Sequence, residues 1–324
     1  MSLRKVPFTS LSVLIALGLA GPAQSQAWPQ KPVRIIYPYA AGSAGDAAAR
    51  LTAQRLGEVF GQPFIVENRV GANGALAAEA VARSPADGHT LFWAASPQIS
   101  IAPAMKKLSY DPVKDFAPIS AVNTHTFVLV VNPRLPARTL AEFVGYVRAQ
   151  PDKLAYAEGS VGSVGHLAMA LFLKRAGLEM TNVSYKGNAP ALTDVIAGHV
   201  PTTFSLIGDT LPHAKSGNIR LLAVSSERRA AQVPDVPTVS ESGYPGYNAI
   251  SWNGLLAPAG TPKLIVDRIA AEVGRAVKDA KFIERLSNIG VEPLGNSPDE
   301  FTALIAAEIP MWAEAVKIAG VGLQ

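Results

Sequence analysis

The sequence of 324 residues contains no cysteine, and only 17% of its residues are charged. Without cysteine the chain cannot form a disulfide framework, a thiolate metal site or a cysteine nucleophile. Beyond the N-terminus, no segment offers the roughly 20 uninterrupted apolar residues of a membrane-spanning helix, so we expect a soluble mature chain. The 29 lysines and arginines are scattered, without a basic block, which argues against a nucleic-acid partner.

The N-terminal segment has the order of a secretory signal peptide. Two basic residues precede the apolar run Leu11–Ala20, which is too short to span a bilayer. Ser25 and Ala27 occupy positions −3 and −1 of an expected cleavage site after Ala27. Cleavage after Ala23 or Ser25, or a short buried helix instead of a signal, are the alternatives. Cleavage after Ala27 leaves 324 − 27 = 297 residues and a net charge of +4 − 2 = +2, and a bacterial periplasm is the expected compartment.

The length and the 48% hydrophobic residues suggest two domains with cores of their own. The apolar run Val33–Pro38 is typical of a strand covered on both faces, and Asp46–Phe60 follows with apolar residues at helical spacing. A strand at 64–67, a helix at 74–83 and a strand at 90–94 continue the series. This alternation predicts an α/β fold in which a mostly parallel sheet is flanked by helices.

A second series of the same kind begins at Phe127–Val131. Thr139 and Glu142 have the spacing of a capping box at a helix start. Farther on, Thr261–Pro262 and Ser297–Glu300 each place a cap before a proline in the first helical position. The remaining expected elements are strands at 153–157, 182–185, 202–207, 219–225 and 250–257 and helices at 163–176 and 189–197. Two α/β lobes are therefore expected, an arrangement in which ligands often bind between the lobes.

The segment Ala41–Asp46, with the letters AGSAGD, joins the first strand to the first helix. Its glycines permit close approach to a ligand, and the helix N-terminus behind it offers free N–H groups to an anion. Asp46 is expected to cap the helix, and a capped turn without a ligand is one alternative. A dinucleotide site is another, supported by Glu67 but not by the G-x-x-G spacing. A nucleophile elbow around Ser43 is the third, although Ser43 lies several residues beyond its strand.

The segment Glu158–His166, with the letters EGSVGSVGH, is a second loop that joins a strand to a helix. Ser160, Gly162 and Ser163 make it flexible and rich in hydrogen-bond donors. Two such loops, one in each lobe, could grip a carboxylate through N–H and hydroxyl groups. Ordinary loop chemistry is the alternative, in which His166 only forms hydrogen bonds at the helix start.

Other polar and aromatic residues give weaker signals. The histidines outside the second loop show no H-x-x-x-H or H-x-H spacing, so a zinc site is not expected. Lys186 could reach an anion or be a solvated turn residue, and Asp194 could contact a ligand or brace a neighbouring loop. Trp93, Phe127 and Trp252 are expected to fill cores rather than line a pocket.

Short motifs follow one another along the whole mature chain in an order that is specific, although each is weak alone. They are WPQKP at 28–32, YPYAAGSAGD at 37–46, AR at 49–50, VENR at 66–69, GANG at 71–74, DGHT at 87–90, GSVGHLA at 162–168, YKGNAPA at 185–191, TD at 193–194, VPT at 236–238, ESGYP at 241–245, WNG at 252–254 and APAGTP at 257–262. In this order and spacing the chain resembles the tripartite tricarboxylate transporter substrate-binding family, the periplasmic proteins also called Bug receptors.

The resemblance implies a type II periplasmic binding protein, a two-lobed Venus flytrap that closes on a small organic acid. In that family main-chain and hydroxyl donors typically hold the carboxylate, which agrees with two Gly-rich loops that contain no arginine or lysine. The candidate ligand-binding residues are Tyr37, Tyr39, Gly42, Ser43, Ala44, Gly45, Asp46, Ser96, Ser160, Gly162, Ser163, His166, Lys186 and Asp194. No catalytic residue, metal or cofactor is implied.

The resemblance also suggests how the lobes divide and what they do. Lobe 1 is expected to comprise 28–124 and 250–324 and lobe 2 to comprise 125–249, with crossings near Asn123–Thr126 and Tyr247–Ser251. The expected function is capture rather than catalysis, by a monomer that delivers its acid to a two-component membrane permease. A receptor that presents its ligand state to a sensor kinase, or an α/β hydrolase, are the alternatives.

Some positions depart from the usual pattern of the family. Ser43 and Ala44 replace glycines that are common in the first loop, Ala170 stands where glutamate is frequent, and His199 replaces a glutamine. We expect these differences to affect which acid is bound rather than family membership.

Overall fold

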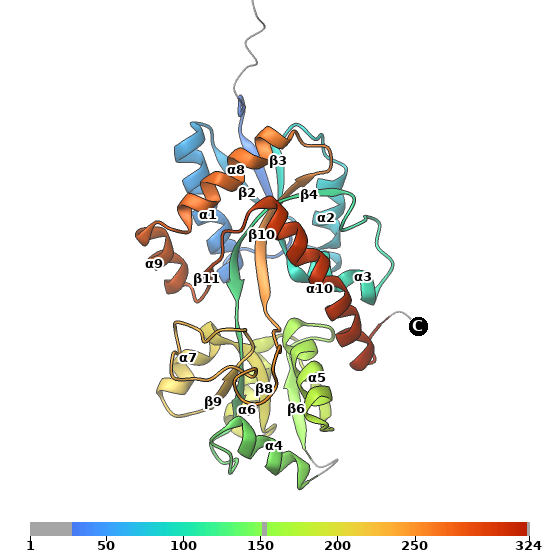
Figure 1. Cartoon of the computed structure of the whole chain (residues 1–324), viewed down its shortest axis with the longest axis vertical. Helices are drawn as coiled ribbons and strands as arrows, with labels where there is room; N and C mark the ends of the chain where they lie inside the picture. The colour runs from blue at the N-terminus through green and yellow to red at the C-terminus, as the bar shows by residue number, and fades with distance from the viewer. Residues whose placement is uncertain (1–27, 151–153, 323–324) are drawn as a thin grey trace, which may run out of the picture.

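The structure is a computed structural model that describes residues 28–150 and 154–322. The expected signal peptide with its cleavage site, and the start of the strand expected at 153–157, lie outside the described residues. Two sheets, each flanked by helices, form two lobes that lie one above the other in Figure 1. The two-lobed α/β fold expected from the sequence is confirmed.

The first lobe contains a six-stranded sheet in the order β11-β4-β10-β3-β1-β2. Its strands are β1 (Val33–Tyr37), β2 (Phe64–Asn68), β3 (Thr90–Ala95), β4 (Phe116–His125), β10 (Ser251–Pro258) and β11 (Glu292–Pro293). Strands β1 to β4 run in one direction, and β10 and β11 run in the opposite direction. Every residue of β3 and β10 is buried, as is typical of central strands covered on both faces.

Helices cover both faces of this sheet and form two separate cores. One core joins the sheet to α1 (Ala44–Phe60), α8 (Lys263–Ala276) and α9 (Ala280–Asn288). The other joins it to α2 (Ala75–Ala82) and to the first half of α10 (Pro298–Ile318). Three short helical segments complete the lobe: η1 (Ala72–Gly74), η2 (Pro97–Ile101) and α3 (Ala102–Met105).

The second lobe repeats this plan with a five-stranded sheet in the order β7-β6-β8-β5-β9. Its elements are β5 (Phe127–Val131), α4 (Leu140–Arg148), β6 (Ala155–Glu158), α5 (Val164–Ala176), β7 (Thr181–Ser184), α6 (Asn188–Ala197), β8 (Thr202–Leu206), α7 (Ile207–Lys215) and β9 (Arg220–Val224). One core lies under α4 and α5, and the other lies under α6 and α7. Strand β5 alone among the described strands of this sheet runs against the others.

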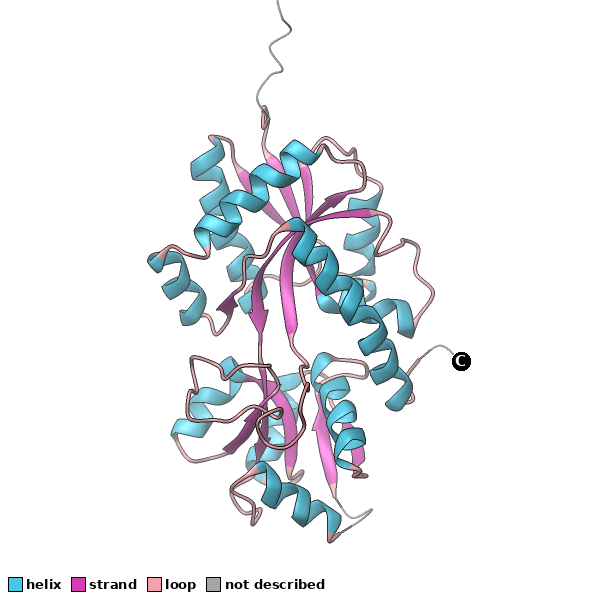
Figure 2. Ribbon diagram, viewed as in Figure 1, coloured by secondary structure: helices cyan, strands magenta, loops and turns pink. Residues whose placement is uncertain are grey.

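The reversed strands β5 and β10 are the segments by which the chain enters a new lobe. Strand β4 passes into β5 with only Thr126 between them, and β10 leads the chain back (Figure 2). A strand by which the chain enters a lobe runs away from the other lobe. It is therefore antiparallel to those strands of its own sheet whose carboxyl ends point toward the other lobe. The carboxyl ends of β1, β3 and β8 therefore meet between the lobes, where α/β folds usually bind ligands.

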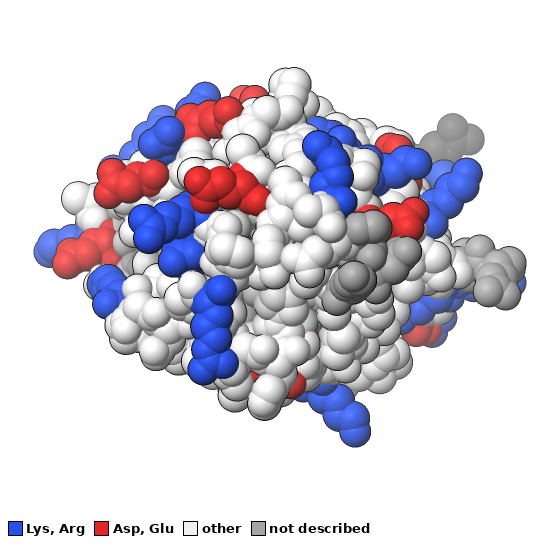
Figure 3. All heavy atoms as spheres, turned by 90° about the horizontal axis from the view of Figure 1, so that it is seen from below, with Lys and Arg blue, Asp and Glu red and all other residues white. Residues whose placement is uncertain are grey.

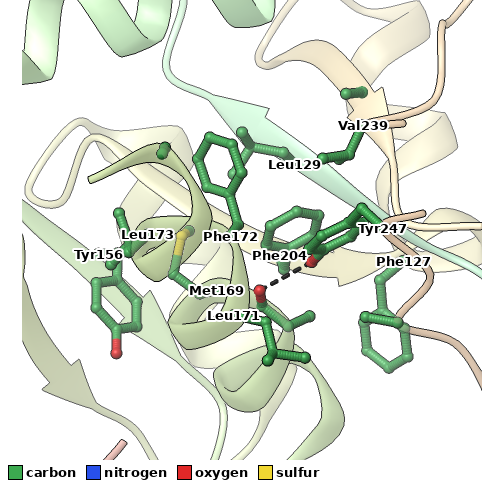
Figure 4. Packing of buried hydrophobic residues seen from close by; sticks show 14 of the residues in the cluster. Phe127, Leu129, Tyr156, Met169, Leu171, Phe172, Leu173, Phe204, Val239 and Tyr247 are labelled. Atoms are coloured by element: carbon green, nitrogen blue, oxygen red, sulfur yellow. Dashed lines mark hydrogen bonds between the residues drawn. The ribbon is translucent and has the colours of Figure 1, made fainter. Parts of the chain in front are cut away.

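The last turns of α10 leave the first lobe and pack on the second. Trp312, Ala315 and Val316 belong to the same buried cluster as the α5 residues Leu167 and Leu171. Figure 4 shows this cluster around Phe172, Phe204 and Tyr247, with the Tyr247 hydroxyl donating to the carbonyl of Ala168 at 2.8 Å. The C-terminal helix thus makes an apolar contact between the lobes in addition to the two chain crossings.

The helix caps agree with the sequence in part. Ser297 and Glu300 form the expected capping box of α10. Thr139 accepts from the Glu142 N–H, but the Glu142 carboxylate accepts from the N–H of Arg138, one residue before the cap. The cap expected at Thr261 is wrong, because its hydroxyl donates to the carbonyl of Pro258 and α8 begins without a side-chain cap.

Charged side chains of both signs are interspersed on the lower face in Figure 3. This face therefore presents a mixed charge pattern rather than a field of one sign. Within residues 28–150 and 154–322, none of the helices combines the length and apolar character needed to cross a membrane.

Candidate ligand-binding site

A cavity of about 330 Å³ lies between the two lobes. It is large enough for a small organic molecule, since ligand pockets begin at roughly 300 Å³. Its lining residues come from both lobes and from both crossings: Tyr37, Tyr39, Ser43, Ala44, Gly45, Asn73, Ala95, Pro97, His125, Phe127, Ser160, Gly162, Ser163, Val164, Gly165, Asn188, Leu206, Ser251 and Asn253.

The first loop brings the N-terminus of α1 to the cavity. Ser43 is the N-cap, and its hydroxyl accepts from the Asp46 N–H at 3.2 Å. Ala44 and Gly45, the first two residues of the helix, line the cavity, and the N–H groups at these positions have no partner inside a helix. A methyl group at position 45 would lie 2.5 Å from the Tyr37 hydroxyl, so glycine is needed for this close approach.

Asp46 supports this loop from behind and is not a lining residue. Its carboxylate accepts from Gly42 N–H at 3.1 Å, from Asn68 Nδ2 at 3.0 Å and from Arg50 through Nε at 2.9 Å and Nη2 at 3.1 Å. Burial alone would raise the pKa of Asp46, but these hydrogen bonds hold it below its ordinary value. The ionised Asp46 carboxylate therefore stabilises the shape of the loop, in part through its hydrogen bond with the Gly42 N–H.

Tyr37 and Tyr39 form the wall next to this loop, with ring centroids 5.7 Å apart. The hydroxyl of Tyr37 lies 2.8 Å from Ser43 Oγ, and burial raises the pKa of Tyr37 to about 12, so it stays protonated. The hydroxyl of Tyr39 accepts from Gln98 Nε2 at 2.6 Å, which leaves its own proton for another acceptor. Both side chains can therefore serve as hydrogen-bond donors.

The second loop presents a helix N-terminus in the same way from the other lobe. Ser163 is the N-cap of α5 and accepts from the His166 N–H at 3.3 Å. Val164 and Gly165, the first two residues of α5, line the cavity. Gly162 has φ +73°, a conformation that favours glycine, and its N–H donates to His166 Nδ1 at 3.1 Å. The cavity thus receives the N-termini of α1 and α5, and Asn188 at the start of α6 also lines it.

His166 lies beneath this loop, only 1% exposed, and does not line the cavity. Its Nδ1 lies 3.2 Å from the carboxylate of buried Glu158, and its Nε2 lies 3.3 Å from Asn182 Nδ2. Burial lowers the pKa of His166, and the nearby Glu158 opposes that shift. In this structure His166 holds the loop backbone at Gly162.

The structure places three further candidates outside the cavity. Ser96 is buried and pairs with Ser251 at 2.9 Å between the hydroxyl oxygens. Lys186 lies between β7 and α6, and Asp194 lies on α6, where it accepts from the Tyr185 hydroxyl at 2.6 Å. That hydrogen bond lowers the pKa of Asp194, which therefore braces its own lobe as a carboxylate.

Several lining residues were not singled out by their sequence. They are Asn73, Ala95, Pro97, His125, Asn188, Leu206, Ser251 and Asn253. Most stand at the end of a strand or the start of a helix. Their place at these boundaries is the feature of the sequence by which they could have been identified. Phe127 lines the cavity while it also belongs to the core of the second lobe, whereas Trp93 and Trp252 are fully buried.

The lining residues include no lysine, arginine, aspartate or glutamate in the described chain. The site therefore offers neutral donors: main-chain N–H groups of two helix starts together with serine, tyrosine and asparagine side chains. Such a set suits an anion, because helix N-termini carry partial positive charge. Phe127, Leu206 and Pro97 add apolar surface for the remainder of a ligand.

Other chemistries find less support at this site. Ser43 pairs with Tyr37 and with the Asp46 N–H, and no histidine bonds its hydroxyl in the described residues. Glu67 is bound to Arg34 at 2.7 Å on the surface and not to the cavity. The described residues contain no group of three His, Asp or Glu side chains suited to a metal ion.

Comparisons with known proteins cover both lobes. The model of a family described as "Tripartite tricarboxylate transporter family receptor" matches residues 48–321. Protein BugT of Bordetella pertussis is 34% identical over 309 residues, 95% of each chain. The solved structure of R. palustris Rpa4515 with adipate is 36% identical, has a TM-score of 0.78 and is matched over 91% of this chain and 99% of its own. MatC (Rpa3494) from Rhodopseudomonas palustris with bound malate is 33% identical, has a TM-score of 0.72 and is matched over 89% and 100%.

Proposed function

This chain belongs to the tripartite tricarboxylate transporter receptor family, and we propose that it captures a small organic acid in the cavity between its lobes. The family is one of solute receptors rather than enzymes. The observation that carries the proposal is the pairing of two helix N-termini, those of α1 and α5, on one cavity without a fixed charge.

Two related structures support the class of ligand. One contains adipate and the other malate, both of which are dicarboxylates. A carboxylate would accept from the N–H groups at Ala44 and Gly45 or at Val164 and Gly165, with the hydroxyl groups of Ser43 and Ser163 nearby. Binding to both lobes at once would stabilise the closed arrangement.

The proposed receptor works outside the cytoplasm and without catalysis. Lobe 1 would comprise 28–124 and 250–324, lobe 2 would comprise 125–249, and the two crossings would serve as the hinge. After export and removal of residues 1–27, the closed receptor would deliver its acid to a two-component membrane permease.

The test is a thermal-shift screen of the mature protein, stripped of bound ligand by unfolding and refolding, against a panel of mono-, di- and tricarboxylates. At a hundredfold excess over Kd, a ligand adds roughly 2.7 kcal/mol of stability. A chain of this size should then melt several degrees higher, at about 2–4 °C per kcal/mol. No shift with any acid would contradict the proposal.

Two N-cap serines provide a matched pair of variants for the same screen. Ser163→Ala removes the cap of α5 at the cavity, whereas Ser297→Ala removes the cap of α10 far from it. Each should cost about 1 kcal/mol of stability. Only Ser163→Ala should also reduce the shift produced by the acid, and an equal reduction in both variants would argue against the role of α5.

A further inference from the structure

His125 is a titratable side chain in the wall of the cavity, at the point where the chain crosses between lobes. It is the last residue of β4, stands opposite Ser251 in the antiparallel pairing with β10, and is half-buried. Unlike the serine, tyrosine and asparagine side chains of the cavity, it can become a cation near neutral pH.

The contacts of His125 define which ring nitrogen carries a proton in the neutral form. Nε2 lies 2.6 Å from Asn253 Oδ1. The amide nitrogen of Asn253 is directed to the carbonyl of Ala94 at 3.4 Å, so its oxygen faces the ring as an acceptor. The amide nitrogen of Asn123 also approaches Nε2, at 3.3 Å, but the much shorter contact with an acceptor places the hydrogen on Nε2 and leaves a lone pair on Nδ1. Within the described chain, Nδ1 makes no side-chain or main-chain hydrogen bond.

The position of His125 relative to the anion-binding loop follows from Asn253. A methyl group at Gly45 would lie 3.2 Å from Asn253 Oδ1 as well as 2.5 Å from the Tyr37 hydroxyl. Gly45, Asn253 and His125 thus form a chain of neighbours that runs from the first turn of α1 to the imidazole. An acid bound at that helix start would lie in the same cavity as the ring.

No acidic group competes for the ring from within the cavity. The other titratable lining residues are Tyr37 and Tyr39, whose pKa values are raised by burial. Glu292 on β11 pairs with Thr124 and accepts from the N–H of Ala231, and it lines the cleft behind the crossings. Asp209, in the first turn of α7, is likewise absent from the cavity wall. A bound ligand can therefore supply the hydrogen-bond partner that His125 Nδ1 lacks within the described chain.

We propose that His125 takes up one proton from solvent when the acid binds and becomes the cation of the occupied site. The inference rests on the proposed function and adds to it a specificity-determining residue and a pH dependence. With Nε2–H still donating to Asn253, the new Nδ1–H would donate to a ligand carboxylate, which suits a fully ionised acid and disfavours neutral analogues such as amides.

The direction of the pH effect follows from the two states of the ring. In the empty site burial lowers the pKa of His125, while the hydrogen bond with Asn253 raises it by less, so the ring is neutral near pH 7. A carboxylate beside the ring favours the charged form and raises the pKa in the complex. Between these two pKa values binding consumes a proton, so affinity increases as pH falls, at most about tenfold per pH unit.

The experiment is isothermal titration calorimetry with adipate, or with the acid that gives the largest thermal shift, at pH 6, 7 and 8. Titrations in buffers of different ionisation enthalpy measure the protons taken up. The wild-type chain should take up a measurable fraction of one proton at pH 7, and its Kd should fall at least about fivefold from pH 8 to pH 6.

His125→Gln is the informative variant, because a glutamine amide nitrogen can still donate to Asn253 but does not titrate. It should bind more weakly at pH 6, take up no proton and vary less than about twofold in Kd over the same range. His213→Gln, in α7 and away from the cavity, is the matched control and should behave as the wild type.

The outcomes separate this inference from the proposed function. Tight binding with no proton uptake in the wild type, or equal uptake in His125→Gln and wild type, would overturn the role of His125 while leaving the receptor intact. Absence of binding for every acid at every pH would instead overturn the proposed function, and the inference with it.

Discussion

At the scale of single residues, the loop that presents α1 depends on one buried carboxylate. Asp46 is bound by Arg50, Asn68 and the N–H of Gly42, and none of these contacts reaches the cavity. Asp46→Asn cannot accept all of these donors. It should lower the free energy of unfolding at pH 7 by about 1–3 kcal/mol and weaken acid binding, as denaturant titration and calorimetry would show.

The same residue has a defined dependence on pH. Because the folded-state pKa of Asp46 is lowered, its contribution is present above the ordinary pKa of an aspartate and is lost as pH falls through the folded value. The difference between Asp46→Asn and wild type should therefore shrink below about pH 4. Glu67→Gln, which breaks the exposed pair with Arg34, is the control and should cost at most about 1 kcal/mol.

Part of the candidate site could be predicted residue by residue. The glycines of the two loops and their place before a helix are local signals, so Ser43 and Ser163 were identified as ligand candidates, but the cap expected at Asp46 is wrong because Ser43 is the N-cap of α1. Asn73 and Leu206 are ordinary residues in their own segments, and only the meeting of strand ends from two lobes brings them together. Asp46 and His166 were ligand candidates as well, but the structure places both behind the loops, and for His166 this is the alternative of hydrogen bonds at the helix start.

At the scale of elements, α10 is linked to the crossing strand β10 through a buried carboxyl group. Glu308, only 6% exposed, accepts from Trp252 Nε1 at 2.8 Å and from Ser100 Oγ at 3.0 Å. Burial raises the pKa of Glu308 to about 7, against the effect of these donors. The folded chain therefore holds more protons here than the unfolded chain between about pH 4.5 and 7, and stability falls as pH rises through that range.

Glu308→Gln should remove this dependence while an oxygen acceptor remains for Trp252 and Ser100. The free energy of unfolding of the variant minus that of the wild type should increase by up to about 3 kcal/mol as the pH is raised from 5 to 8. Denaturant titrations at both pH values provide the measurement. A difference between variant and wild type that stays constant with pH would show that Glu308 does not titrate in this range.

Most elements could be predicted because their apolar residues recur at the period of a strand or helix. The clearest omission is β4, Phe116–His125, whose sequence FAPISAVNTH mixes proline, small residues and polar residues. It is a strand because β10 and β11 pair with it on either side, and such partners are distant in the sequence. The cap expected at Thr261 failed for a different, local reason, since the carbonyl of Pro258 three residues earlier competes for the hydroxyl.

At the scale of the whole molecule, the lobes are joined by two chain crossings and by the end of α10. Trp312 is fully buried in the core of the second lobe, whereas Phe301 on the same helix is buried in the first. Trp312→Ala should cost about 3–5 kcal/mol and weaken the contact between lobes. In scanning calorimetry we expect a single transition for wild type and two separated transitions for Trp312→Ala.

Phe301→Ala is the control for this experiment, because it removes a fully buried aromatic ring within one lobe. It should lower the midpoint and leave one transition. Two transitions in both variants, or one in both, would mean that the end of α10 does not couple the unfolding of the lobes.

The passage from β4 to β5 through the single residue Thr126 has a kinetic consequence. If the proposed opening bends the chain at this residue, no loop has to lose or regain order there, so little conformational entropy is spent in either direction. In the proposed receptor this crossing then adds no slow step of its own, and the residence time of the acid depends on the bonds that hold it. In such a receptor, stronger bonds to the acid give tighter capture and, for the same reason, slower release.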